Sequence, residues 1–253
     1  MNDEASALYR YVLRLGDLAL VLGQRLSEWV GHAPALEEDL GLANVALDLI
    51  GQARLLLAYA GEIEGRGRGE DEIALLREER QYLNPTLAEQ PNGDFGETIV
   101  RQVLLDAFQL ALYERLTSSR DERLAAVAEK AVKETRYHVR YSAGWLVRLG
   151  DGTQESHVRV QRALDRLWPY TVELFEADAL DREMAARGIA PDLGEVHGAW
   201  MRHIDEVLAE ATLDRPAVRP FTWFGKRGEH SEHLGYLLAE MQYLQRTYPG
   251  ARW

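Results

Sequence analysis

The sequence predicts an all-α protein built on one four-helix bundle, with additional C-terminal helices packed around it. Apolar residues recur at intervals of three and four along most of the chain, as on one face of a helix. No segment alternates apolar and polar residues long enough to indicate a strand. Four helical segments are long and carry narrow, alanine-rich stripes, which is typical of a bundle. There is no low-complexity segment and no fixed-period repeat, so we expect residues 1–253 to form a single domain.

The first two long helices are expected before residue 31 and over residues 39–61. Gly31 and Pro34 end the first helix, and Asp39 is a suitable N-cap for the second. Each helix would be about 30 Å long. Their apolar stripes are Leu8, Val12, Leu15, Ala19, Leu22, Leu26 and Trp29, then Ala43, Ala46, Ile50, Ala53, Leu57 and Ala60.

The middle of the chain predicts two further long helices, over residues 96–117 and 122–149. A shorter helix over residues 71–83 precedes them and ends at Asn84-Pro85. Asp121 caps the longer helix, and Gly150-Asp151-Gly152 ends it. The main stripes are Val100, Leu104, Ala107 and Ala111, then Leu124, Ala128, Ala131, Thr135, His138, Ser142, Trp145 and Leu149.

After residue 153 the pattern predicts three additional helices. The first, over residues 154–187, contains Trp168-Pro169 and should kink at the turn before the proline. The others cover residues 192–211 and 229–248, and a loop with two prolines separates them.

Composition excludes several classes of protein. The formal net charge of −12 argues against a nucleic-acid partner, because recognition of the phosphate backbone needs a basic surface. The chain has no cysteine, which excludes disulfides, thiolate metal sites and a cysteine nucleophile. No apolar run approaches the roughly 18 residues of a membrane span, and the first residues are acidic where a signal peptide is basic. We therefore expect a cytoplasmic protein without a membrane contact.

The interior of a long four-helix bundle can hold a carboxylate-bridged di-iron centre. Such a centre takes one Glu from each of two helices and a Glu-x-x-His pair from each of the other two. The i, i+3 spacing places both ligands of a pair on one inward face. Here His138 follows Thr135, which has no carboxylate, and the second helix offers only Ile50 and Ala53 at the matching depth.

Three possible ligands of such a centre remain, and one complete pair is missing. The three are Glu28, Asp106 and His138. We therefore predict no metal site and no catalytic residue in this chain, and regard these positions as remnants of a ligand set. His138 is expected to be a core histidine that hydrogen-bonds Asp106 or Glu28, because buried polar groups need partners. Glu28 is equally compatible with a surface position at the end of its helix.

Residues 229–233, Glu-His-Ser-Glu-His, offer a second possible metal site. His230 and His233 with flanking acids are compatible with zinc. The same carboxylates suit a helix N-terminus, where they offset the helix dipole. A capping or interface role is the favoured interpretation, and metal binding is left open.

The loop over residues 221–227 combines aromatic and basic side chains. Trp223 and Phe224 lie beside Lys226 and Arg227, a combination that suits the base and phosphates of a nucleotide. The favoured interpretation is that the aromatic residues anchor the loop to the bundle. Contact with CoA is left open.

Six segments then carry a specific resemblance. They are residues 24–34 (QRLSEWVGHAP), 43–54 (ANVALDLIGQAR), 89–93 (EQPNG), 133–138 (KETRYH), 232–235 (EHLG) and 239–246 (AEMQYLQR). In this order, and over nearly the whole chain, they resemble the non-catalytic subunits of the multicomponent ring 1,2-phenylacetyl-CoA epoxidases. The resemblance implies a ferritin-like fold and a role in aerobic phenylacetate degradation.

The resemblance also implies partners. They are a catalytic di-iron subunit, small accessory subunits and a reductase, which together epoxidise phenylacetyl-CoA with O₂ and electrons from NADPH. The catalytic sister subunit would have its Glu-x-x-His pairs at Ile50 with Ala53 and at Thr135 with His138, and its single acids at Glu28 and Asp106. The cofactor is therefore expected in the partner and not in this chain.

Two alternatives remain open: an autonomous di-iron enzyme or iron-storage protein, and a helical module that binds CoA thioesters. A structural subunit should also self-associate when it is isolated, so a homodimer is expected. The candidate contact is the last helix, where Tyr236, Tyr243 and Tyr248 lie beyond the core stripe, since aromatic residues are enriched at interfaces.

Overall fold

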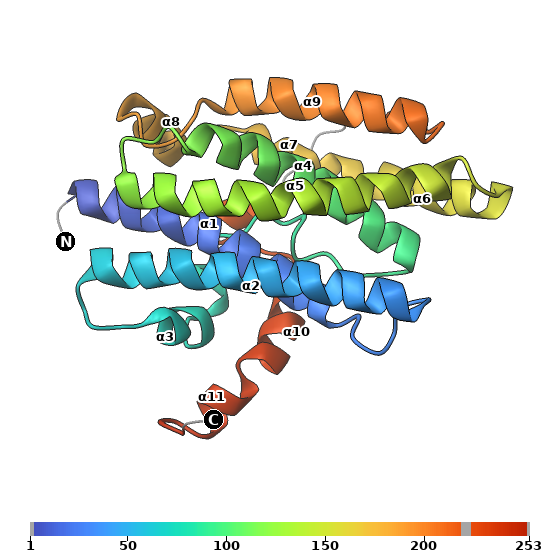
Figure 1. The fold of residues 1–253 in the computed structure, drawn as a ribbon. Helices are drawn as coiled ribbons and strands as arrows, with labels where there is room; N and C mark the ends of the chain where they lie inside the picture. Colours follow the sequence, from blue (N-terminus) through green and yellow to red (C-terminus); the bar gives the residue numbers. More distant parts are fainter. Residues whose placement is uncertain (1–2, 219–223, 252–253) are drawn as a thin grey trace. The chain divides into compact units, whose positions relative to one another are not determined.

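The computed structural model describes residues 3–218 and 224–251, and no strand occurs among them (Figure 1). The chain divides into two compact units, Met1–Pro91 with Trp223–Trp253, and Asn92–Thr222. The all-α prediction is confirmed. The single domain remains a prediction.

The first unit is built on an antiparallel pair of long helices. Gly16 and Gly23 of the first helix face Leu57 and Ile50 of the second, and a Cβ at either glycine would lie 2.7 Å and 3.0 Å from those side chains. The glycines therefore let the two helices approach closely. The elements of this unit are α1 (Asp3–Ser27), α2 (Leu36–Glu64), α3 (Glu70–Leu75), η1 (Glu79–Gln81), η3 (Gly225–Arg227), α10 (Glu232–Met241) and α11 (Tyr243–Thr247).

The second unit is also built on a pair of long helices, α4 and α5, with later helices packed against it. Trp200 of α9 donates its indole N–H to the Leu104 carbonyl of α4 at 2.9 Å, which fixes α9 on the pair. The elements are α4 (Phe95–Leu116), α5 (Glu122–Gly150), α6 (Gln154–Leu167), η2 (Trp168–Thr171), α7 (Val172–Phe175), α8 (Ala179–Ala186) and α9 (Leu193–Glu210).

The predicted start of the second helix is wrong by one turn. α2 begins at Leu36, and Asp39 uses its carboxylate to accept a hydrogen bond from the Gly31 N–H at 2.7 Å. Asp39 thus closes the α1–α2 turn instead of capping α2. The helix also runs past Gly61 to Glu64, where Gly65 adopts a left-handed conformation (φ 67°) and ends it.

Three of the predicted helices are broken. The segment 71–83 forms α3 and η1, with an intervening turn. The kinked helix expected over residues 154–187 is split into α6, η2, α7 and α8. Pro169 lacks an N–H and lies in the 3₁₀ turn η2, so the break is sharper than the expected kink. The last predicted helix is likewise divided into α10 and α11.

The buried faces agree with the predicted stripe on α5 and for the most part on α2. Leu124 to Ser142 of the α5 stripe is buried as expected. On α2 the predicted Ala46, Ala53, Leu57 and Ala60 are buried, whereas Ala43 and Ile50 are half-buried. The buried face of α2 also includes Leu42, Leu49 and Leu56. α2 is apolar enough on both faces that one 18-residue window has a mean hydropathy of 1.4. By length and composition this helix meets the criterion for a membrane span, as core helices of soluble proteins also do.

Candidate functional site

A buried polar layer lies along the facing sides of α4 and α5 in the second unit. Asp106 accepts hydrogen bonds from the side chains of Gln102, at 2.7 Å, and Ser142, at 2.8 Å. Ser142 also lies 3.0 Å from the His138 carbonyl. These four residues and Thr135 have no solvent exposure. Two of the predicted remnant ligands, Asp106 and His138, therefore lie within one layer.

The Asp106 carboxyl has an altered pKa. Burial raises its pKa to about 6, against the opposing effects of the charge of His138 and the hydrogen bonds from Ser142 and Gln102. His138 thus lies close enough to Asp106 to influence its charge, and a hydrogen bond between the two side chains stays a prediction. A carboxyl that ionises near neutrality at full burial places an unfavourable charge inside the helix pair.

Asp106→Asn should stabilise the protein above pH 6 and leave it nearly unchanged near pH 4. The folded state retains the Asp106 proton up to about pH 6, whereas the unfolded state loses it near its ordinary pKa of 3.8. Wild-type stability should therefore fall as pH rises through this window and then level off. The asparagine amide keeps an acceptor for Gln102 and offers a donor to Ser142.

The gain in the free energy of unfolding from Asp106→Asn should approach about 3 kcal/mol at pH 7, from a shift of roughly two pKa units at 1.36 kcal/mol each. Urea unfolding of both proteins between pH 4 and pH 8 measures it. Parallel pH profiles for the wild type and Asp106→Asn would contradict the assignment.

The corresponding positions of the first unit do not offer ligands. Ile50 and Ala53 are hydrocarbon, and both line a cavity of about 180 Å³ formed by α1, α2 and α3. Glu28 lies just after α1 and accepts a hydrogen bond from Arg25 at 2.7 Å. Its side chain is about one-third exposed, at 34%. The structure thus places Glu28 at a helix end, the second of the two positions considered for it.

The residues at these positions do not fit a di-iron centre. Thr135 stands where one carboxylate is required, and the pair Ile50 and Ala53 has no side-chain atom that can bind a metal. Among residues 3–218 and 224–251, no three His, Asp or Glu side chains are grouped as metal ligands.

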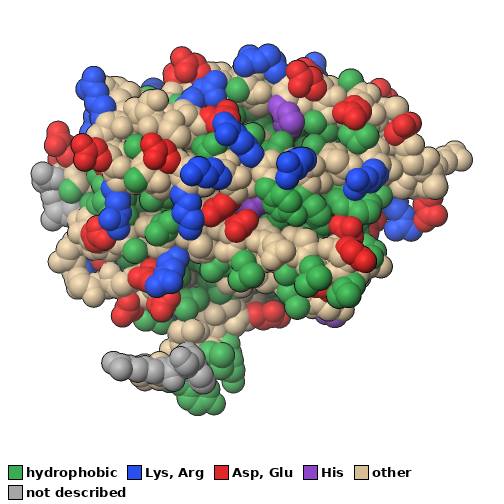
Figure 2. Space-filling model, viewed as in Figure 1, with side chains coloured by type: hydrophobic (Ala, Val, Ile, Leu, Met, Phe, Trp, Pro, Cys, Tyr) green, Lys and Arg blue, Asp and Glu red, His purple; other side chains and the backbone are tan. Residues whose placement is uncertain are grey.

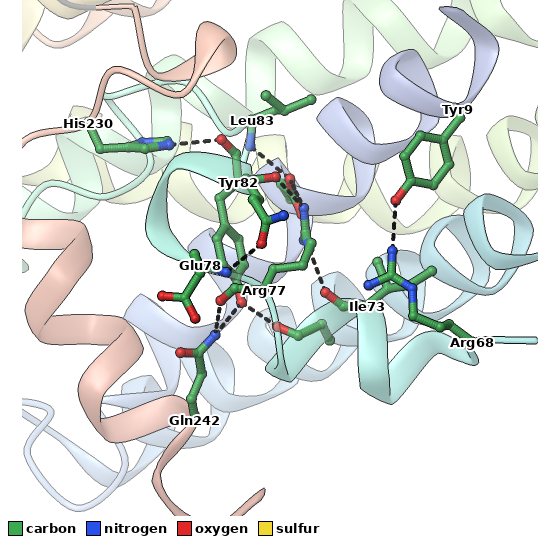
Figure 3. Close-up of polar contacts among 12 residues, drawn as sticks. Tyr9, Arg68, Ile73, Arg77, Glu78, Tyr82, Leu83, His230 and Gln242 are labelled. Atoms are coloured by element: carbon green, nitrogen blue, oxygen red, sulfur yellow. Dashed lines mark hydrogen bonds and ion pairs between the residues drawn. The ribbon is translucent and has the colours of Figure 1, made fainter. Parts of the chain in front are cut away.

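A larger polar cluster lies in the first unit around Arg77 (Figure 3), whose side chain pairs with Asp17. These side chains form a bidentate ion pair, of which one contact, Arg77 Nη1 to Asp17 Oδ2, measures 2.9 Å. Asp17 also accepts from the Leu83 N–H at 2.8 Å, and Arg77 donates to the Ile73 carbonyl. Both charged side chains are buried. The pair fixes the segment after α3 to the middle of α1.

This cluster continues to the C-terminal helices through Tyr82. The guanidinium of Arg77 lies 4.2 Å from the centre of the Tyr82 ring. Gln242 donates to the Tyr82 hydroxyl at 2.7 Å and to the Arg77 carbonyl at 2.9 Å. Burial raises the pKa of Tyr82 to about 12, so its hydroxyl stays protonated and donates to the Ala74 carbonyl. The junction of α10 and α11 is therefore held by polar contacts (Figure 3).

His230 is held between two acceptors. Its Nδ1 lies 2.9 Å from the Glu89 carboxylate, and its Nε2 lies 2.8 Å from the Tyr82 carbonyl. Glu89 also accepts from Asn84, at 3.0 Å, and from the Ser231 N–H, at 2.7 Å. Because both of these acceptors require a donor from the ring, the arrangement favours the doubly protonated imidazole. This agrees with an architectural role for the segment 229–233, and metal binding there remains untested.

The aromatic-basic loop can be described only in part, because residues 219–223, including Trp223, lie outside the described residues. The Lys226 side chain is buried, and its carbonyl accepts from Arg14 at 3.1 Å. Arg227 lies over the Phe224 ring at 4.5 Å. A Cβ at Gly225 would lie 2.3 Å from the Asn84 carbonyl, so this loop packs tightly against residues 84–86. The described part of the loop is anchored through Gly225 and the Lys226 carbonyl, and anchoring by the aromatic residues stays a prediction.

Sequence reasoning missed Asp17, Arg77 and Glu89. Each is a single charged residue whose partner lies at least 60 positions away along the chain. The local signal that was available is Asp17 itself, a carboxylate amid the apolar run of α1.

The chain is similar to known proteins over nearly its whole length. The family described as phenylacetic acid catabolic protein matches residues 1–253. One subunit of the 1,2-phenylacetyl-CoA epoxidase of Escherichia coli (strain K12) is 53% identical over 246 residues, which cover 97% of this chain and 99% of that protein. Both matches extend across both units and confirm the resemblance carried by the six segments. The chain belongs to the phenylacetic acid catabolic protein family.

Proposed function

We propose that this chain is the structural, non-catalytic subunit of a phenylacetyl-CoA epoxidase complex. The observation that carries the proposal is the set Ile50, Ala53 and Thr135, which stands where three metal ligands would be required. The identity of 53% with a subunit of the Escherichia coli epoxidase supports a place in such a complex. The di-iron cofactor would then belong to a catalytic partner.

The partners proposed with this function are the di-iron subunit, the accessory subunits and a reductase, in the cytoplasm. Isolated chains would form a homodimer. The exposed tyrosines of the C-terminal helices remain the proposed contact, with 74% of Tyr236, 59% of Tyr243 and 54% of Tyr248 exposed. Conversion of the isolated dimer to a monomer by Tyr243→Glu, measured by size-exclusion chromatography, is the expected result for this contact, and an unchanged dimer would contradict it.

The purified chain should contain no stoichiometric iron after expression in iron-replete medium. Its positions 50, 53 and 135 supply no carboxylate or imidazole. Elemental analysis of the chain alone, and of the chain copurified with its catalytic partner, measures this directly. A two-metal cluster in the isolated chain would support the autonomous di-iron alternative instead.

The CoA-binding alternative has less support from the structure. Lys226, one of its two cations, is buried, whereas Arg227 is exposed and lies over the Phe224 ring. Within the described part of the loop, Arg227 alone of these two cations is open to a phosphate.

A further inference from the structure

The outward side of α2 is an apolar surface without a partner helix in its own unit. Leu36, Leu40 and Leu47 lie on one side of the helix at intervals of four and seven, and are 72%, 59% and 69% exposed. Half-buried small residues continue this side. We call it the α2 outer face: Leu36, Leu40, Ala43, Leu47, Gly51 and Ala58. Arg54 lies on the same side between Gly51 and Ala58, has a side chain that is 74% exposed and pairs with Glu70 at 3.0 Å, so the apolar part of the face ends at Gly51.

Figure 2 shows hydrophobic side chains gathered over α2 in the first unit. Val30 is 58% exposed and extends this surface. It lies beside the start of α2, because the N–H of the neighbouring Gly31 donates to Asp39 in the first turns of that helix. Contiguous exposed apolar surface of this kind marks an interaction site.

Gly51 is a second, independent sign of close contact on this face. A Cβ at this position would meet no atom of residues 3–218 or 224–251 within 4 Å, so packing against these residues does not require glycine there. Glycine in the middle of a helix lowers its stability. A neighbouring helix that crosses α2 near Gly51 would use the missing side chain for close approach.

The two edges of the α2 outer face differ. One edge carries the carboxylates Glu37, Asp48 and Glu62. The other edge opens into the cavity of about 180 Å³, which is lined by Ile50, Ala53 and other apolar residues and, at its polar positions, by Gln24, Arg54, Glu70 and Asp71. A large apolar side chain from a partner could enter that cavity, as anchor residues do at the centres of interfaces.

The charges argue against a second copy of this chain on the same face. An antiparallel pair of α2 helices would bring two acidic edges together. A parallel pair would bring together two acidic first turns, each with Glu37, Glu38 and Asp39. Like charges at an interface suppress that pairing. A lipid surface is also disfavoured, because Asn44 and Asp48 lie within the same stretch of helix.

We infer that the α2 outer face binds a helix of the di-iron partner subunit that is apolar along one side and carries Lys or Arg along one edge. This inference rests on the proposed function, since it assigns that partner to a surface. An interface of standard size needs about 800 Å² on each side, so the partner would cover Val30 and the cavity as well as the leucines.

The test uses the full chain with an affinity-tagged di-iron subunit. Leu40→Glu and Leu47→Glu place a charge in the middle of the face, and Val158→Glu on α6 is the matched control, since Val158 is 56% exposed outside it. Capture of Leu40→Glu and Leu47→Glu should fall at least tenfold, and that of the control should stay within twofold. Circular dichroism should show the same melting temperature for all variants.

Each other outcome has a definite meaning. Capture of Leu40→Glu and Leu47→Glu at the wild-type level overturns the inference and leaves the proposed function intact. Failure to capture the wild type contradicts the proposed function and removes the basis of the inference. A wild-type dimer that Leu47→Glu converts to a monomer assigns the face to a second copy. Flotation of the wild type with phosphatidylcholine vesicles assigns it to a membrane. Either result overturns the heteromeric assignment.

Discussion

Arg77→Met should lower the free energy of unfolding by about 3–5 kcal/mol, because it leaves the buried Asp17 carboxylate without its counter-charge. Arg77 also donates to the carbonyls of Ile73 and Gln81, which would lose their donor. Urea unfolding at pH 7 measures the loss. The destabilisation should extend to the α10–α11 junction. Gln242, at this junction, donates to the Arg77 carbonyl and to the hydroxyl of Tyr82, whose ring lies against the Arg77 guanidinium.

Two variants control this prediction. Asp17→Asn with Arg77→Met removes both charges and should recover part of the loss, since the asparagine oxygen can still accept from the Leu83 N–H. Arg136→Met removes one partner of an exposed ion pair with Glu114 and should cost less than about 1 kcal/mol. If Arg77→Met lowers the free energy of unfolding no more than Arg136→Met does, the buried Asp17–Arg77 pair does not stabilise the fold.

Restoring the missing ligands should destabilise the chain unless metal is supplied. Thr135→Glu carries the largest cost, about 3–5 kcal/mol, because the new carboxylate is fully buried in the layer that already holds Asp106. Ala53→His buries a polar ring and costs about 1–3 kcal/mol if it finds no partner. Ile50→Glu should cost least, since Ile50 is half-buried beside a cavity.

Thermal melting of the triple variant, with and without Fe²⁺, measures this effect. Thr135→Val is the matched control: the Thr135 hydroxyl makes no hydrogen bond among the described residues, so its removal should be neutral or stabilising by about 1 kcal/mol. A triple variant that melts no lower than the parent without metal would show that these positions tolerate charge and are not enclosed.

The long helices were predictable because their signals are local. Asp121 caps α5, and the helix ends at Gly150, as the sequence indicates. The stripe on α5 was predictable for the same reason, since that helix has one apolar side and one charged side. The stripe on α2 was predictable only in part, because this helix is apolar on both sides and periodicity alone does not define the whole buried face.

The sequence predicted which residue types occupy the candidate ligand positions, but it predicted less well where these side chains lie in the fold. The absence of a ligand set follows from Ile50, Ala53 and Thr135 read directly from the sequence. The placement of Glu28 depended on where α1 ends, and helix ends are the least certain part of a periodicity argument. The pairs Asp17–Arg77 and Glu89–His230 join distant segments, so their partners could not be found from local sequence.

The central claim is that another subunit requires this chain and that the chain itself does no chemistry. The most direct measurement is O₂-dependent epoxidation of phenylacetyl-CoA by the purified di-iron subunit with its reductase, with and without this chain. We predict activity only when the chain is present, with the iron bound by its partner. Full activity of a soluble di-iron subunit in the absence of this chain would contradict the account.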